Sequence, residues 1–172
     1  TAKDYLWNGT SIMADSSADR RVFIDAVYPK DYKQFHKTAK MAREAIEIYP
    51  REVIPFNFPF PKITLFNGEG RFGAMEFPMI INSSDFDNSQ RMTSLVAHEV
   101  IHSYFPFHIM TNESDYAFMD EGLVSFFEGE TMTRINKRKN ADEVPEFNLN
   151  IFHALSGRAR EAPPMVRSYA IT

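Results

Sequence analysis

Cysteine is absent from this 172-residue chain, and it has neither a long apolar run nor an excess of basic residues. Without cysteine there is no disulfide and no thiolate metal site, and either redox compartment is compatible with the sequence. The formal net charge of -4 provides no basic face for nucleic acid. No stretch approaches the roughly 20 apolar residues of a membrane span, and the N-terminus does not resemble a signal peptide. We therefore expect a soluble protein that binds neither nucleic acid nor membrane, and extracytoplasmic if one compartment had to be named.

The composition is that of a globular protein, with 44% hydrophobic residues, enough for one core. We expect a single domain over residues 1–172. Residues 1–88 are predicted to form mainly strands and one helix, residues 89–137 a pair of helices, and residues 138–172 a tail of loop and helix. Because the chain begins without Met and stops at Thr172 within ordinary globular sequence, we interpret it as part of a longer protein.

Hydrophobic periodicity predicts the elements of the first half. Alternation of apolar and polar residues indicates a strand over 22–27, and a short apolar run indicates another over 63–66. Apolar residues at three- and four-residue spacing predict an amphipathic helix over 31–49. One or two further strands are expected over 74–81, where Pro78 indicates an edge strand or a bulge.

Two helices are expected in the second half. The first is capped at residue 88 or 89 and runs to about Phe105, because Pro106 cannot continue it. The second begins between residues 112 and 114. Its residues expected to face the core are Phe118, Met119, Leu123, Phe126, Phe127 and Met132. Another helix is expected around residues 149–155.

The first of these helices carries the pattern H-E-x-x-H at His98, Glu99 and His102. Residues four apart lie one turn from each other on the same face of a helix, so both imidazoles can reach one ion. Zinc suits this arrangement, but a catalytic zinc site needs a third protein ligand. The motif alone is not sufficient, because two core-facing histidines without a metal, beside a surface Glu99, explain the same spacing.

Glu121 supplies that third ligand from the next helix, nineteen positions after His102. Two imidazoles and a carboxylate from a second helix are the set that distinguishes gluzincin metallopeptidases. Glu128 lies two turns beyond Glu121, where it can bond the free ring nitrogen of a ligand histidine and fix its tautomer. The prediction is that His98, His102 and Glu121 bind Zn²⁺ and that Glu99 is the general base.

Three motifs in order resemble the catalytic domain of the aminopeptidase N family of zinc aminopeptidases. The run Gly73-Ala74-Met75-Glu76 resembles the family's G-A-M-E-N exopeptidase motif. Residues 96–102 resemble its zinc-binding segment, and residues 119–123 resemble its W-x-x-E-G segment. A fourth segment, Pro-Phe-Pro-Lys-Ile at residues 59–63, is similar to one that precedes the exopeptidase motif. The resemblance covers roughly residues 29–130.

This resemblance implies an α+β fold like a thermolysin-type metallopeptidase domain, with a mixed sheet beside the active-site helices and without the full helical lobe. It implies that Glu76 holds the free α-amino group of a peptide substrate. Backbone groups around Gly73, Ala74 and Met75 would line that substrate. The expected function is removal of N-terminal residues from peptides by metal-activated water.

The chain also departs from the family. Phe77 replaces the family's Asn, and Pro106-Phe107 replaces its Gly-Asn pair, so the side-chain preference does not carry over. The family's oxyanion-stabilising Tyr lies well over fifty residues beyond the third ligand. Tyr169 comes too early for that role, so we expect the chain to end before the catalytic Tyr and to bind zinc without efficient catalysis.

Two alternatives stay open beside the aminopeptidase. One is an endopeptidase, or a hydrolase of another substrate, on the same zinc site. The other is a non-catalytic interaction domain that keeps the fold. The remaining histidines, His36, His108 and His153, lie outside any ligand spacing and are expected to have no role in the site.

Overall fold

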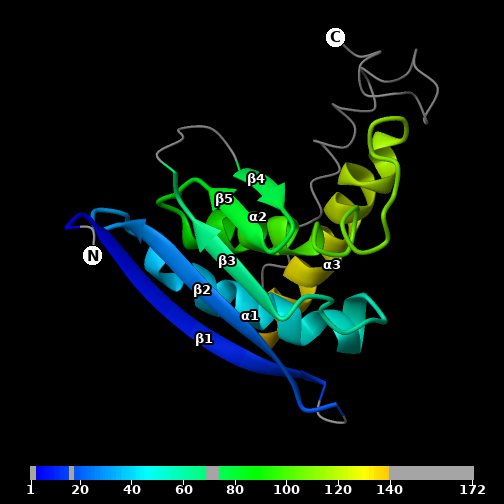
Figure 1. The fold of residues 1–172 in the computed structure, drawn as a ribbon, viewed down its shortest axis with the longest axis horizontal. Helices are drawn as coiled ribbons and strands as arrows, with labels where there is room; N and C mark the ends of the chain where they lie inside the picture. The colour runs from blue at the N-terminus through cyan, green and yellow to red at the C-terminus, as the bar shows by residue number, and fades with distance from the viewer. Residues whose placement is uncertain (1–2, 16–17, 69–73, 140–172) are drawn as a thin grey trace.

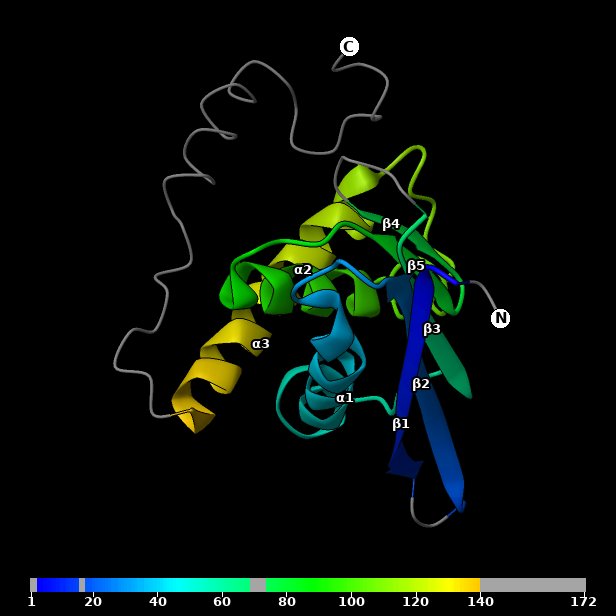
Figure 2. The same ribbon diagram turned by 90° about the vertical axis from the view of Figure 1, so that its left-hand side faces the viewer.

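A five-stranded mixed sheet forms one side of the molecule, and helices cover one of its faces (Figure 1). This is a computed structural model that describes residues 3–15, 18–68 and 74–139. The strands are β1 (Tyr5–Asp15), β2 (Arg20–Pro29), β3 (Lys62–Phe66), β4 (Ala74–Phe77) and β5 (Ile80–Ser83). The helices are α1 (Thr38–Ile48), α2 (Ser89–Ile101) and α3 (Glu121–Arg138), with short turns η1 (Phe35–Lys37), η2 (Tyr49–Val53) and η3 (Ala117–Met119). Figure 2 shows α1 beside the sheet and α3 farther from it.

The strands follow the spatial order β1-β2-β3-β5-β4, which leaves β4 at an edge. The two outer pairs, β1 with β2 and β4 with β5, are antiparallel, whereas β2, β3 and β5 run parallel. Glu76 of β4 pairs with Ile81 of β5, which is buried on the helix-covered face. Because directly paired residues share a face, Glu76 points to the helix side of the sheet. The expected mixed α+β fold is thus confirmed.

Strand prediction was right for the centre of the sheet and incomplete at its borders. β2 and β3 contain the segments expected at 22–27 and 63–66, while β1 was not predicted. Two strands form in the region 74–81, but Pro78 lies in the turn between them and not in a strand. Proline's fixed φ suits the first turn position, and Met79 follows it with φ 64°.

The helix over 31–49 begins later than predicted. Backbone N–H groups of Lys33 and Gln34 donate to the Asp85 carboxylate at 2.8 and 3.1 Å, which holds this stretch outside the helix. The α-helix then runs from Thr38 to Ile48 and continues into the η2 turn, which contains Pro50.

The two later helices also have shifted ends. Asn88 caps α2 by accepting from the Arg91 N–H at 2.9 Å, but the helix stops at Ile101 and not near Phe105. The Asn112 side chain accepts from the Asp115 N–H at 3.3 Å, so it caps a turn, and α3 begins only at Glu121.

One hydrophobic core joins the sheet to α1, α2 and the start of α3. Two residues expected in this core, Phe118 and Phe126, are 38% and 57% exposed instead. Val124, Thr131 and Ile135 are the fully buried residues on α3, with Met132 nearly so. None of the helices formed by the described residues has the length and apolar character of a bilayer-spanning segment. The helix expected at 149–155 lies outside the described residues.

The buried Tyr49 ties the η2 turn to α2. Its hydroxyl donates to the Ala97 carbonyl at 2.8 Å, and its ring meets Tyr104 edge to face at 5.8 Å. This bond anchors α2 next to the H-E-x-x-H motif.

Tyr49→Phe should lower the free energy of unfolding by about 1 kcal/mol, because it removes one buried hydrogen bond and keeps the ring. Urea denaturation of the purified chain measures this value. Tyr116→Phe, at a 45% exposed residue, is the matched control. Equal stabilities for the two variants would show that the Tyr49 bond does not hold α2.

Candidate metal centre

Three potential ligand atoms converge where the end of α2 meets the start of α3. His98 Nε2 lies 3.3 Å from His102 Nε2 and 3.3 Å from Glu121 Oε2. His102 Nε2 lies 4.0 Å from the same carboxylate oxygen. A helix turn brings the two imidazoles together, and α3 presents Glu121 as its first residue.

Two of these three separations match the geometry of a tetrahedral ion, and the third is wider. Around zinc with bonds of about 2.05 Å, neighbouring ligand atoms lie about 3.3 Å apart. The three observed separations are 3.3, 3.3 and 4.0 Å. Two nitrogens and one oxygen are also a donor set found in catalytic zinc sites. The residues His98, His102 and Glu121 therefore fit a zinc ion.

The outer nitrogen of His98 is held by Glu128. Their atoms, Nδ1 and Oε2, lie 3.0 Å apart, and the other Glu128 oxygen accepts a hydrogen bond from the Ser94 hydroxyl. With a proton on Nδ1, the Nε2 lone pair of His98 faces Glu121 and His102. Glu128 thus lies where helix periodicity placed it, two turns beyond Glu121.

Asp120 and Phe105 hold the outer nitrogen of His102. His102 Nδ1 lies 3.1 Å from the Phe105 carbonyl, with the alignment of a hydrogen bond, and 2.7 Å from Asp120 Oδ1. The turn after Ile101 brings this carbonyl back toward the ring. The sequence interpretation missed Asp120, although a second carboxylate directly before a ligand Glu was a usable signal.

The carboxylates around the two imidazoles favour protonated histidines when no metal is bound. Burial alone lowers the pKa of His98, but hydrogen bonds to Glu121 and Glu128 outweigh it and raise the pKa to about 10. Burial also lowers the pKa of His102. The contact with Asp120 outweighs this effect, so the pKa of His102 is raised. The hydrogen bond to His98 lowers the pKa of Glu121.

Glu99 is only 5% exposed and lies beside this centre. Burial raises its pKa to about 7, against the opposing effect of His98 and His102. The alternative interpretation, two histidines without a metal, predicted Glu99 at the surface. The structure shows Glu99 buried instead. A carboxylate with a pKa near neutrality can both accept and return a proton.

Glu76, on the edge strand β4, also lies beside the histidine cluster. One of its oxygens lies within 4.8 Å of ligand atoms of Glu99 and His102. Glu113, which the sequence interpretation also missed, contacts Asp120, and burial together with Asp120 and Glu76 raises its pKa.

Some of the remaining predicted site residues lie among the described residues, and others do not. Ala74 and Met75 lie on β4, where Met75 is 50% exposed and alternates with Glu76 along the strand. Gly73 and Tyr169 lie outside the described residues. Of the other histidines, His36 and His108 are exposed and outside the cluster, and His153 is not described.

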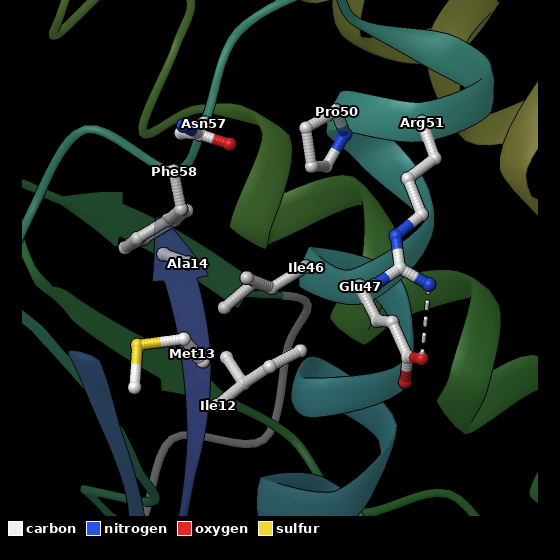
Figure 3. Close-up of a pocket in the computed structure, with 9 residues that line it drawn as sticks. All are labelled: Ile12, Met13, Ala14, Ile46, Glu47, Pro50, Arg51, Asn57 and Phe58. Atoms are coloured by element: carbon white, nitrogen blue, oxygen red, sulfur yellow. Dashed lines mark ion pairs between the residues drawn. The ribbon is translucent and has the colours of Figure 1, made fainter. Parts of the chain in front are cut away.

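Two hollows elsewhere share no residue with the cluster. One of about 190 Å³ lies between the end of β1, α1 and η2 (Figure 3), and its charged residues Glu47 and Arg51 pair with each other at 3.6 Å. The other, about 270 Å³, lies between the start of α2 and the end of α3. Neither brings together groups that could bind a metal or activate water, so we place the candidate site at the histidine cluster.

No family model and no curated protein matches the sequence. In structure, the chain is similar to an M1 zinc metallopeptidase from Deinococcus radiodurans, with a TM-score of 0.61 and 12% identity over 89% of this chain and 33% of that one. A mutant M1 zinc metallopeptidase from the same organism, bound to a Tyr-Ser-Ala substrate, gives a TM-score of 0.56 and 12% identity over 93% and 34%. The fold is similar to that of M1 metallopeptidase domains. The chain spans about a third of the length of these neighbours, and at this identity the likeness concerns the fold alone.

Zinc binding should release at least one proton at pH 7, from His98. The pKa of His98 is raised to about 10, so this ring is protonated without metal, and a zinc ligand must be neutral. The pKa of His102 is raised as well, so this ring adds to the release as pH falls. The zinc dissociation constant should therefore fall at least about tenfold per pH unit near neutrality. Calorimetry in buffers of different ionisation enthalpy counts these protons.

His98→Gln should bind zinc weakly and release about one proton fewer, whereas His108→Gln, at an exposed histidine, should behave like the parent chain. Zinc binding without proton release would contradict this account of the histidines.

Proposed function

We propose that this chain carries the metal-binding core of a zinc-dependent aminopeptidase. The observation that carries the proposal is the convergence of His98 Nε2, His102 Nε2 and Glu121 Oε2 at separations of 3.3 to 4.0 Å, with the buried Glu99 beside them. The fold similarity to M1 zinc metallopeptidases supports the same conclusion. In this proposal His98, His102 and Glu121 hold the ion. When bound, zinc would supply Lewis acidity for water and for a peptide carbonyl.

The residues around the metal have separate tasks. Glu99 takes a proton from the attacking water and delivers it to the leaving amine, a role that suits its pKa of about 7. Glu128 and Asp120 hold the two imidazoles in the tautomer that turns Nε2 inward. Each carboxylate attracts the ring proton of its histidine, which makes the other ring nitrogen a stronger metal ligand.

Glu76 gives the proposal its exopeptidase character. It points to the helix side of the edge strand β4 and lies within 4.8 Å of Glu99 and His102. In this position its carboxylate can pair with the ammonium of a peptide N-terminus while the first peptide bond lies at the metal. A blocked N-terminus would leave the carboxylate buried without a partner, which costs several kcal/mol. An endopeptidase would have no use for this anchor.

Zinc-loaded protein should cleave free aminoacyl-nitroanilides slowly, because no residue here matches the family's catalytic Tyr, but still about a hundredfold faster than their N-acetylated forms. Glu99→Gln should keep zinc and lower kcat/KM by about 10²- to 10⁴-fold, because it removes only the base. The rates and the zinc content are measured on the same samples. Glu47→Gln, the same change at the remote hollow, serves as the control.

Equal cleavage of free and acetylated substrates would favour the endopeptidase or another hydrolase. Full zinc occupancy with no hydrolysis that depends on Glu99 would favour the non-catalytic interaction domain.

A further inference from the structure

We propose that two copies of this chain pair through the free edge of β1 and form one continuous sheet. The inference goes beyond the proposed function and does not rest on it, because β1 lies at the opposite edge of the sheet from β4 and Glu76. The candidate metal centre of each copy would therefore lie at an outer end of the joined sheet.

The free side of β1 carries unpaired backbone groups. Phe23 of β2 donates its N–H to the Pro61 carbonyl at 3.0 Å, on the side of β3. Ser11, which lies opposite Phe23, therefore directs its N–H and C=O away from β2, and Arg43 Nε donates to this carbonyl at 3.1 Å. By the same alternation, three more residues direct their backbone groups outward: Trp7, Gly9 and Met13. Within the described residues, no hydrogen bond reaches the backbone groups of these three.

The two edges of the sheet differ in their protection against pairing. Natural edge strands are often short, or carry charges and prolines that discourage pairing with another chain. β4 has only four residues, one of which is Glu76. β1 has eleven residues, and its sequence contains no charged residue and no proline from Tyr5 to Ala14. β1 is therefore the edge that can accept another strand along most of its length.

The sequence of β1 is complementary to itself in one antiparallel register, with Gly9 opposite Gly9 of the second copy. On the helix side of the sheet, this register places Leu6 opposite Ile12. It also places Asn8 opposite Thr10. Apolar side chains thus meet apolar ones and polar side chains meet polar ones, as in stable cross-strand pairs. The two neighbouring registers are less favourable, because one pairs Leu6 with Thr10 and the other pairs Asn8 with Ile12.

The ends of the strand fit the same register. Lys3 of one copy comes level with Asp15 of the other, and their charges are opposite. The register shift between Met13 and Asp15 ends the regular ladder there, which limits the length of the pairing. Because the two-fold arrangement uses the β1 edge of both copies, it closes as a dimer and leaves no β1 edge for a third chain.

Leu6 gives the interface an apolar contact. It lies on the helix side of β1, opposite the buried Tyr28, and is nonetheless 49% exposed. In the proposed register it lies next to Ile12 of the second copy. Ile12 lines the hollow of Figure 3, together with Ala14 and Ile46. Pairing would therefore remove apolar surface of Leu6 from water.

The Trp7 ring does not block this edge. It lies over Gly9, where an added Cβ would meet ring atom Cζ2 at 3.1 Å. Its Nε1 donates to the carboxylate of Asp25, on β2, at 3.2 Å. The ring is thus held on the face of the sheet and directed toward β2, away from an incoming strand.

The metal-free full chain should show a monomer–dimer equilibrium in sedimentation velocity between about 1 and 100 μM. Leu6→Lys should weaken the dimer about tenfold or more, because it places a charge at an apolar contact. Ser11→Pro should have the same effect, because it removes a donor on the free side and no bond to β2. Ile80→Lys, at a 45% exposed residue of β5, is the matched control and should dimerise like the parent. Circular dichroism confirms that each variant is folded.

Cross-linking tests the register. The chain has no cysteine, so a disulfide can form only between introduced residues. A mixture of Asn8→Cys and Thr10→Cys chains should give more disulfide-linked dimer on oxidation than either variant alone. Phe23→Cys, at a 57% exposed residue of β2, measures the yield of random collisions.

Three results would overturn the inference. The first is a parent chain that stays monomeric up to about 500 μM. The second is a dimer that either Leu6→Lys or Ser11→Pro leaves unchanged, and the third is cross-linking of the mixture no stronger than that of Phe23→Cys. Neither measurement uses zinc or a substrate, so a failure of the proposed function leaves this test unaffected.

Discussion

The structure depends most on one constraint: two imidazole nitrogens and a carboxylate oxygen face one another at 3.3 to 4.0 Å. Three lone pairs directed at one point repel each other unless a positive charge lies between them. Protons can supply that charge, and the raised pKa values of His98 and His102 are the consequence. A zinc ion supplies it with better geometry, because ligand atoms about 3.3 Å apart suit a tetrahedral ion.

The surrounding fold keeps this arrangement in place. Tyr49 anchors α2 through the Ala97 carbonyl, and the early end of α2 returns the Phe105 carbonyl to His102. Glu128 holds the other ring from α3. The edge strand β4 adds Glu76 on the helix side of the sheet. Helix ends and a sheet edge therefore supply the chemical groups, while the apolar faces of the same elements form the core.

Sequence was informative where structure is local. The spacing of His98 and His102 and the two-turn step from Glu121 to Glu128 follow from helix periodicity alone. Asp120 and Glu113 were missed because their approach to His102 and to each other depends on the turn between the helices. Two other errors have different causes. Contacts with Asp85 delay the start of α1, and β1, with Ile12 as its only buried residue, shows little alternation. The 12% identity to the similar structures explains why comparison revealed the fold and not the sequence motifs.

X-ray absorption at the zinc edge tests the central claim most directly, because it reports the atoms bound to the ion. The account predicts two imidazole nitrogens and carboxylate oxygen at about 2.0 to 2.2 Å in the zinc-loaded chain, with one imidazole lost in His98→Gln. A spectrum without imidazole scattering, or one that His98→Gln leaves unchanged, would contradict it.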